Sequence, residues 1–325
     1  MLAVRDVVRV KSYNDPKITV PFSLLVLGLS IVISTVNAAE LEGPVLRLIN
    51  ADRPLIIGHR GYPQFAPENT LPAFKFARES GADLVELDYH LSKDGVPMIM
   101  HDYTLDRTTD AVKQWGGEKI RLDTKTAAEL QTLDAGKWFD PKYAGTKILR
   151  LSEALDAIQS AGAVTLVERK EGDPSTCLNL LRENQLINRL VVQAFDWEYL
   201  RKFHELEPAQ ILGALGPPKR FADGRVPGDR PKQLDATWLD ELVKTGAKVV
   251  VWSDQVTSGA VEQAHGRGLK VWVYTINDSA AANKMLDLGV DGIITNNTGL
   301  LWRILALRAM KDGKQSKREG VSPRF

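Results

Sequence analysis

Cysteine is almost absent from this sequence. The single cysteine among the 325 residues, Cys177, leaves no internal disulfide and no set of thiolates for a zinc cluster. Cys177 falls within a predicted helix, where we expect it to be a small buried side chain rather than a reactive thiol. Disulfides and zinc–thiolate clusters therefore do not stabilise this fold.

An excess of charge of either sign is absent as well. Lysine and arginine total 42 and aspartate and glutamate total 41, which gives a net charge of +1. Such a chain has no overall field to attract polyanions, so nucleic acid is not an expected partner. The composition, 44% hydrophobic with 25 Gly and 16 Pro, is that of an ordinary folded protein and excludes disorder, collagen-like repeats and a wholly membrane-embedded chain.

The first 38 residues have the pattern of an export signal. Four basic residues precede an uncharged apolar run over residues 20–36, and small residues, among them Ala38 and Ala39, follow it. This order predicts a signal peptide that is cleaved near Ala38 and an exported, periplasmic or secreted protein. The 17-residue run is also at the lower limit for spanning a bilayer, so the alternative is an uncleaved N-terminal anchor, the one membrane contact that we expect.

The remaining chain alternates short β-branched runs with amphipathic helical segments, which is typical of βαβ units. Eight such strands, each followed by a helix, predict an α/β protein with a (β/α)8 TIM barrel over residues 39–310. Residues 311–325 are predicted to form a basic tail. The expected strands cover residues 55–59, 84–89, 164–169, 190–195, 210–214, 248–252, 270–275 and 292–295.

One apolar run does not fit the count of eight. Residues 96–101 follow the second strand after Asp94-Gly95, a strong hairpin signal, so this run must be antiparallel to that strand. A two-residue turn at Asp94 and Gly95 would place Asp88 opposite His101. Residues 102–147 contain no clear barrel strand and are predicted to be an insertion at the barrel mouth.

Active sites of such barrels lie at the carboxyl ends of the strands, and several polar side chains are found there. Glu86 and Asp88 are two residues apart and leave the same face of the second strand, while Glu168 ends the third. Unpaired carboxylates are costly to bury, so a cation is expected among them. Three oxygen donors without cysteine favour one divalent ion, Ca²⁺ or Mg²⁺, over zinc.

Two histidines and two basic residues accompany the carboxylates. His59 ends the first strand and His101 ends the hairpin, and the pair can exchange protons with a nucleophile and a leaving group. Arg60 and Lys170 offer cationic donors for phosphate oxygens. A lone histidine is more often structural, but two beside acidic residues on neighbouring strands predict general acid and base catalysis of phosphoryl transfer.

These residues resemble the glycerophosphodiester phosphodiesterase family. The likeness covers about residues 55–300 and is carried by His59-Arg60-Gly61, Pro67-Glu68-Asn69-Thr70, Glu86-x-Asp88, Asp94-Gly95, His101-Asp102, Arg107-Thr108-Thr109, Glu168-x-Lys170 and Leu288-Gly289-Val290-Asp291-Gly292-Ile293-Ile294-Thr295. It implies that Glu86, Asp88 and Glu168 bind a metal, that His59 and His101 are acid and base, and that the products are glycerol 3-phosphate and an alcohol.

Further substrate contacts are expected outside the catalytic group. Glu68 follows the first strand and is assigned either a structural role or a direct contact. Gln193 and Trp272 close later strands and are candidates for the glycerol pocket. Asn296 stands where the family usually has aspartate.

The sequence thus predicts an exported, metal-dependent phosphodiesterase that hydrolyses the small glycerophosphodiesters left after phospholipid deacylation. One rival is phospholipase-D-like hydrolysis of lysophospholipids on the same scaffold, which a mouth lined by apolar side chains from the insertion would favour. The other is a non-catalytic binding protein, which would require a damaged site, whereas all five proposed metal and proton-transfer residues are present.

Overall fold

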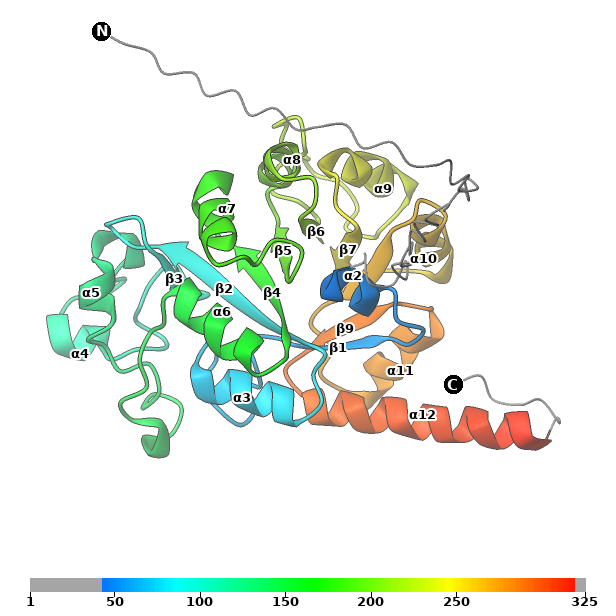
Figure 1. Cartoon of the computed structure of the whole chain (residues 1–325), viewed down its shortest axis with the longest axis horizontal. Coiled ribbons are helices and arrows are strands. Elements are labelled where there is room, and N and C mark those ends of the chain that lie inside the picture. The colour runs from blue at the N-terminus through cyan, green and yellow to red at the C-terminus, as the bar shows by residue number, and fades with distance from the viewer. Residues whose placement is uncertain (1–42, 319–325) are drawn as a thin grey trace, which may run out of the picture. The chain divides into compact units, whose positions relative to one another are not determined.

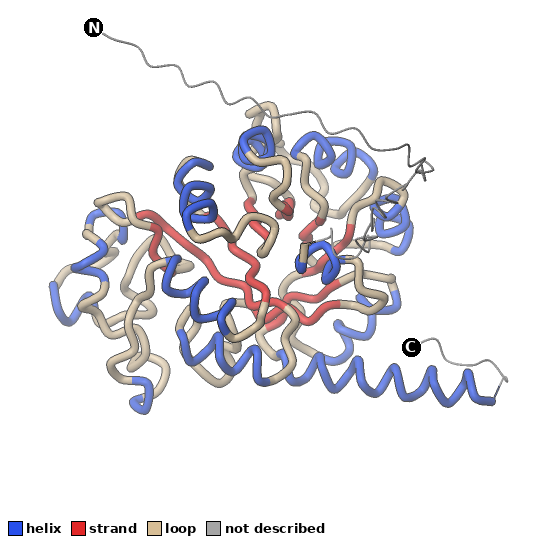
Figure 2. Tube along the Cα trace, viewed as in Figure 1, coloured by secondary structure: helices blue, strands red, loops and turns tan. Residues whose placement is uncertain are grey.

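The chain forms the predicted barrel. A computed structural model describes residues 43–318, with side chains to residue 311 (Figure 1). Eight parallel strands make a closed sheet, because β1 pairs with both β9 and β2 (Figure 2). These strands are β1 (Leu55–Gly58), β2 (Leu84–Leu91), β4 (Val164–Arg169), β5 (Val191–Ala194), β6 (Ile211–Gly216), β7 (Val249–Trp252), β8 (Lys270–Val273) and β9 (Gly292–Thr295). Each lies in or overlaps one of the predicted ranges.

Helices alternate with the barrel strands as the pattern predicted. Several begin at an aspartate or threonine whose side chain accepts a backbone N–H of the first turn, as at Asp173, Asp196 and Asp278. The helices of the barrel are α3 (Leu71–Glu79), α6 (Leu151–Ser160), α7 (Pro174–Glu183), α8 (Trp197–Leu206), α9 (Ala236–Leu242) continued by the 3₁₀ turn η3 (Val243–Thr245), α10 (Ser258–His265), α11 (Ser279–Asp287) and α12 (Thr298–Arg318).

The barrel interior is closed at its amino-terminal end by a short helix, α2 (Pro44–Ile49). Val45 and Ile49 of this helix are buried against inward-facing strand residues such as Leu55 and Leu84. The lower interior is therefore apolar and packed. Polar inward-facing side chains are concentrated at the opposite end, where the strands finish.

The hairpin after β2 is confirmed, but its predicted register is wrong by one residue. Strand β3 (Pro97–Ile99) runs antiparallel to β2 with Tyr89 opposite Ile99, and the Met100 N–H bonds to the Asp88 carbonyl. The loop contains three residues rather than two, with Gly95 in the left-handed conformation at φ 77°. Asp88 therefore lies opposite Met100, not His101.

The insertion packs on this hairpin with a small core of its own. Met98 and Met100 contribute to that core together with Leu105, Leu122 and Leu130. The segment contains only short helices: α4 (Ala111–Trp115), η1 (Leu122–Thr124), α5 (Ala127–Leu130) and η2 (Pro141–Tyr143). It contacts the loop after β1 through Arg107, which bonds to Glu68, and through the hydroxyl of Tyr143, which bonds to the Phe65 carbonyl.

The two ends of the chain bear on two other predictions. The predicted signal segment, residues 1–38, lies outside the described residues. Within residues 43–318, no helix is both long and apolar enough to cross a bilayer. At the other end, the predicted tail from residue 311 begins inside α12, which continues to Arg318.

Candidate active site

Three carboxylates from two adjacent strands meet inside the barrel mouth. Glu86 and Asp88 are on β2, and Glu168 is at the end of β4, directly opposite Asp88 in the strand register. One ligand oxygen from each lies within 4.8 Å of the others, and all three side chains are buried. Glu86 Oε1 makes no hydrogen bond within the described part of the chain. A buried, unsatisfied oxygen among three carboxylates fits a hard divalent cation.

Burial and mutual repulsion shift the protonation of this cluster. Burial, with repulsion from Asp88, raises the pKa of Glu168 to about 7 and that of Glu86 well above its usual value. Burial would also raise the pKa of Asp88, but attraction to Lys170, His101 and Arg60 holds it below its usual range. The cluster thus carries more negative charge than it readily holds without a cation.

Lys170 and Arg60 lie on either side of Asp88. Lys170 Nζ is 2.8 Å from Asp88 Oδ1 and also bonds to Glu168, whereas Arg60 Nε is 3.5 Å from Asp88 Oδ2. The backbone N–H of Arg60 donates to Glu86 at 2.7 Å, which fixes the loop after β1 against the cluster. Both predicted phosphate-binding cations are therefore at the carboxylates.

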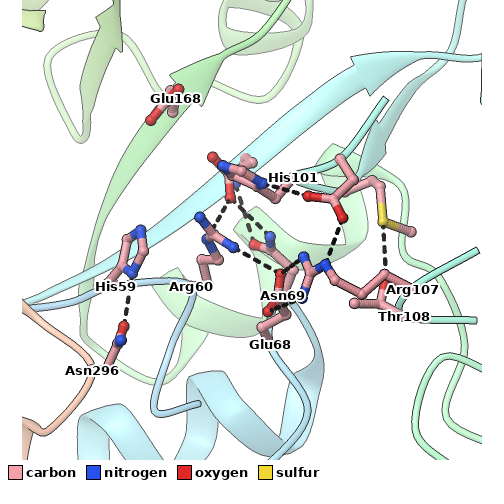
Figure 3. Close-up of polar contacts among 12 residues, drawn as sticks. His59, Arg60, Glu68, Asn69, His101, Arg107, Thr108, Glu168 and Asn296 are labelled. Atoms are coloured by element: carbon pink, nitrogen blue, oxygen red, sulfur yellow. Dashed lines mark hydrogen bonds and ion pairs between the residues drawn. The ribbon is translucent and has the colours of Figure 1, made fainter. Parts of the chain in front are cut away.

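His101 is held by a chain of charged hydrogen bonds (Figure 3). Its Nδ1 lies 2.7 Å from Asp102 Oδ1, and Arg107 donates to the other Asp102 oxygen at 2.5 Å. Both terminal nitrogens of Arg107 donate hydrogen bonds to Glu68. Glu68 accepts a further hydrogen bond from Arg60 at 2.9 Å. The network joins the imidazole of His101 to the cationic side of the metal cluster.

His59 has a neutral partner instead. Its Nδ1 lies 2.7 Å from Oδ1 of Asn296, the residue after β9 (Figure 3). The amide oxygen can only accept, so Nδ1 carries the proton and Nε2 keeps a free electron pair. Burial, reinforced by the nearby Arg60 guanidinium, lowers the pKa of His59 to about 4. The ring is neutral near pH 7 and suited to accept a proton.

These side chains line one wall of a pocket of about 230 Å³ in the barrel mouth. His59, Arg60, Glu86, His101, Glu168 and Lys170 make its charged part. The other wall is formed by Gln193 and by the apolar or aromatic side chains of Phe195, Leu215, Tyr274 and Ile294, and no residue after His101 in the insertion is part of it. Gln193 Oε1 is buried without a partner among the described residues and is available to a ligand.

Two predicted substrate contacts are not at this pocket. Trp272 is fully buried in the lower barrel interior beside Gly292, where a Cβ would lie 2.6 Å from its ring, so its assignment to the glycerol pocket is wrong. Its side chain belongs to the layer of inward-facing residues below the barrel mouth. Tyr274, two residues further along the chain, lies in the layer above and lines the pocket. Glu68 does not line the pocket because its oxygens accept from Arg60 and Arg107, which leaves the structural alternative.

The structure shows which residues support the site. Asn69, which belongs to the motif that carries the family resemblance, donates to Asp88 at 2.9 Å and accepts from its backbone N–H, so it positions a metal-site carboxylate. Asp102 and Asn296 orient the two histidines. Phe195 and Tyr274 directly follow β5 and β8. Each is two residues after an inward-facing side chain of its strand, Gln193 or Trp272, so the alternation along the strand could have placed it at the mouth.

Comparisons with known proteins agree with this geometry. The profile of the Glycerophosphoryl diester phosphodiesterase family matches residues 59–300. A Bacillus subtilis glycerophosphodiester phosphodiesterase is 30% identical over 301 residues, which are 86% of this chain and 95% of that protein. An Oleispira antarctica phosphodiesterase, solved with the product sn-glycerol-3-phosphate, has a TM-score of 0.67 at 26% identity and covers 78% of this chain and 97% of its own. A glycerophosphodiester phosphodiesterase from Agrobacterium tumefaciens has a TM-score of 0.61 at 27% sequence identity. The match covers 76% of this chain and 98% of that protein.

Proposed function

Because the chain belongs to the glycerophosphoryl diester phosphodiesterase family, we propose that it hydrolyses glycerophosphodiesters to glycerol 3-phosphate and an alcohol with the aid of one divalent metal ion. The observation that carries this proposal is the meeting of an acidic cluster, two phosphate-binding cations and two oriented histidines on one wall of a single pocket.

Glu86, Asp88 and Glu168 are the residues that would hold the ion. When bound, a divalent cation neutralises charge on the phosphate oxygens and polarises the phosphorus. Ca²⁺ and Mg²⁺ both accept such an all-oxygen set. Lys170 and Arg60 border the same carboxylates and would donate to the remaining phosphate oxygens.

The two histidines divide the proton transfers. His59 Nε2, kept unprotonated by the bond from Nδ1 to Asn296, takes the proton of the nucleophile, which is water or the substrate's own glycerol 2-hydroxyl. Attack by the hydroxyl gives a cyclic phosphate first, and water then opens this ring to glycerol 3-phosphate. Burial lowers the pKa of His101, whereas its pairing with the Asp102 carboxylate favours the imidazolium, and we assign to this side chain the donation of a proton to the oxygen of the leaving alcohol. The bond from phosphorus to that oxygen breaks as the new one forms.

The pocket favours a small substrate over a lysophospholipid. Its volume of about 230 Å³ is below the range of pockets for drug-sized ligands, roughly 300–1,000 Å³. Its apolar wall comes from barrel strands rather than from the insertion, so the feature expected of a lysolipid enzyme is not found among the residues that line it. Phe195 and Tyr274 line this wall and would contact the glycerol carbons or the headgroup of a bound substrate.

Release of glycerol 3-phosphate from glycerophosphocholine and glycerophosphoethanolamine, measured with EDTA, Ca²⁺ or Mg²⁺, tests the reaction. We expect release with metal and none with EDTA. His59→Ala and His101→Ala should each lower the rate by roughly 10²- to 10⁴-fold while the protein stays folded. Activity on lysophospholipid micelles alone would replace this proposal with the lysolipid one.

We also propose that the protein is exported. The order of basic residues, apolar run and small residues before Glu40 supports this. Amino-terminal sequencing of the protein recovered from the producing cell tests it. A mature chain beginning near Ala39 is expected, whereas an intact terminus in the membrane fraction would indicate an anchor.

A further inference from the structure

Helix α12 has two apolar faces, and only one of them is covered. Leu301 and Ile304 are buried where the helix packs against β1 and α11. On other sides of the helix, Trp302, Leu307 and Met310 are 56%, 49% and 58% exposed, although part of the Trp302 ring lies against Gly81. At 100° per residue these three side chains lie within about 140° of arc, away from the buried face. Figure 1 shows the last turns of α12 continuing beyond the neighbouring helices.

The charges on this helix are of one sign. Residues 298–311 include no aspartate or glutamate, and Arg303 and Lys311 are both exposed, Arg303 within the outward arc and Lys311 about 40° beyond its Leu307 edge. Arg308 faces the protein, where it donates to Asp287 at 2.6 Å and to Asn283, and so fastens α12 to α11. In residues 312–318 the sequence adds Lys314, Lys317 and Arg318 against Asp312 alone.

We propose that the outward face of α12, formed by Trp302, Arg303, Leu307 and Met310 with Lys311 beside its edge, binds the surface of a bilayer that contains anionic phospholipid. A helix that lies in the interface inserts its apolar side chains at the boundary between headgroups and acyl chains, and its basic residues meet anionic lipid. Tryptophan is particularly suited to that boundary.

A second copy of the chain fits this face less well. In a symmetric pair the same face would meet itself, and each basic residue would find no acidic partner on residues 298–311 of the other copy. An anionic bilayer supplies both missing components, an apolar layer and negative charge. The inference does not depend on the proposed function or on residues 20–36.

The net charge of the molecule does not by itself attract it to an anionic bilayer. Without residues 1–38 the chain has 38 basic and 39 acidic residues, a net charge of −1. An anionic vesicle therefore repels the protein as a whole, weakly, and attraction must come from a local surface. If the proposed phosphodiesterase activity also holds, this surface keeps the enzyme at the membrane where deacylation of phospholipids supplies its substrate.

Co-sedimentation with vesicles tests the proposal. Residues 38–325 form one compact unit with its own core, so the protein beginning at Ala39 is suitable. It is mixed with vesicles of phosphatidylcholine alone or of phosphatidylcholine with phosphatidylglycerol. We expect the protein to bind the anionic vesicles and to bind the neutral ones at least about tenfold more weakly. Added salt should weaken the binding to anionic vesicles.

Two double variants of α12 test whether its outward face is the membrane-binding surface, and two single variants of α8 are the controls. The double substitutions Arg303→Glu/Lys311→Glu and Trp302→Ala/Met310→Ala should each weaken binding about tenfold or more. Lys202→Glu and Leu206→Ala change comparably exposed residues of α8 and should leave binding unchanged. Release of glycerol 3-phosphate should be the same in all four, since none is placed at the site.

Each other outcome overturns the proposal. Equal binding by wild type and the α12 variants would assign the membrane contact to another surface. Equal binding to neutral and anionic vesicles would remove the role of the basic residues. A dimer in solution that dissociates in the α12 variants, without vesicle binding, would identify a second copy as the occupant.

Discussion

Glu168→Gln should stabilise the metal-free protein at alkaline pH, although it removes a proposed metal ligand. The glutamate is buried with two other carboxylates, and its pKa rises from 4.5 to about 7. Each unit of pKa corresponds to about 1.4 kcal/mol, so keeping Glu168 ionised in the folded, metal-free protein costs about 3 kcal/mol.

The raised pKa of Glu168 determines how the stability of the folded protein changes with pH. The folded protein binds this proton more tightly than the unfolded chain, so its stabilising contribution is complete below pH 4.5 and disappears as the pH rises through 7. Glutamine has no proton to lose. The difference in unfolding free energy, Glu168→Gln minus wild type, should therefore increase by about 3 kcal/mol between pH 4.5 and pH 8.

Urea unfolding in EDTA at several pH values measures this difference. Glu79→Gln is the control, because Glu79 is an exposed carboxylate on α3 and its removal should give a nearly constant difference. Addition of Ca²⁺ or Mg²⁺ at 100 times its Kd should stabilise the wild type by about 2.7 kcal/mol and the Glu168→Gln variant much less. The reasoning fails if wild type and Glu168→Gln lose the same stability between pH 4.5 and 8 in EDTA.

Three further outcomes are expected from the site. Burial lowers the pKa of His59, the proposed base, to about 4, so the acidic limb of the rate profile should lie well below pH 6.5. Asn296→Asp should move that limb to higher pH, since a carboxylate favours the imidazolium, and an unmoved limb would mean that Asn296 does not influence the pKa of His59. Asp102→Asn should lower kcat by roughly 10²-fold or more with the fold intact, and near-normal turnover would dismiss the Asp102 pairing as unimportant. Gln193→Leu should raise KM for glycerophosphocholine about tenfold with little change in kcat, as measured by steady-state kinetics, because a buried hydrogen-bonding group is lost; an unchanged KM would show that Gln193 does not contact substrate.

The sequence by itself determined the barrel and the chemical core of the site. Alternation of short β-branched runs with amphipathic helices is a local property, and in this chain it was sufficient to count eight strands. Glu86, Asp88 and Glu168 could be placed together because side chains two apart on a strand share a face and parallel strands end at one edge. The same rule placed His59 and Lys170 beside them.

Only the tertiary structure decided which residues support that core. The partnership of His59 with Asn296 joins residues 237 positions apart, and no periodicity specifies which side chain closes such a distance. Trp272 and Tyr274 share a face of β8, but the layer that each reaches depends on the stagger of strands around the barrel, and that stagger buries Trp272 beside Gly292. The hairpin register depended on one extra loop residue: Gly95 is left-handed but Asp94 is not, which fits a three-residue loop that ends in glycine rather than a two-residue turn with both residues left-handed. Local pattern thus fixes which face a side chain leaves from, while its partner and depth depend on packing between distant segments.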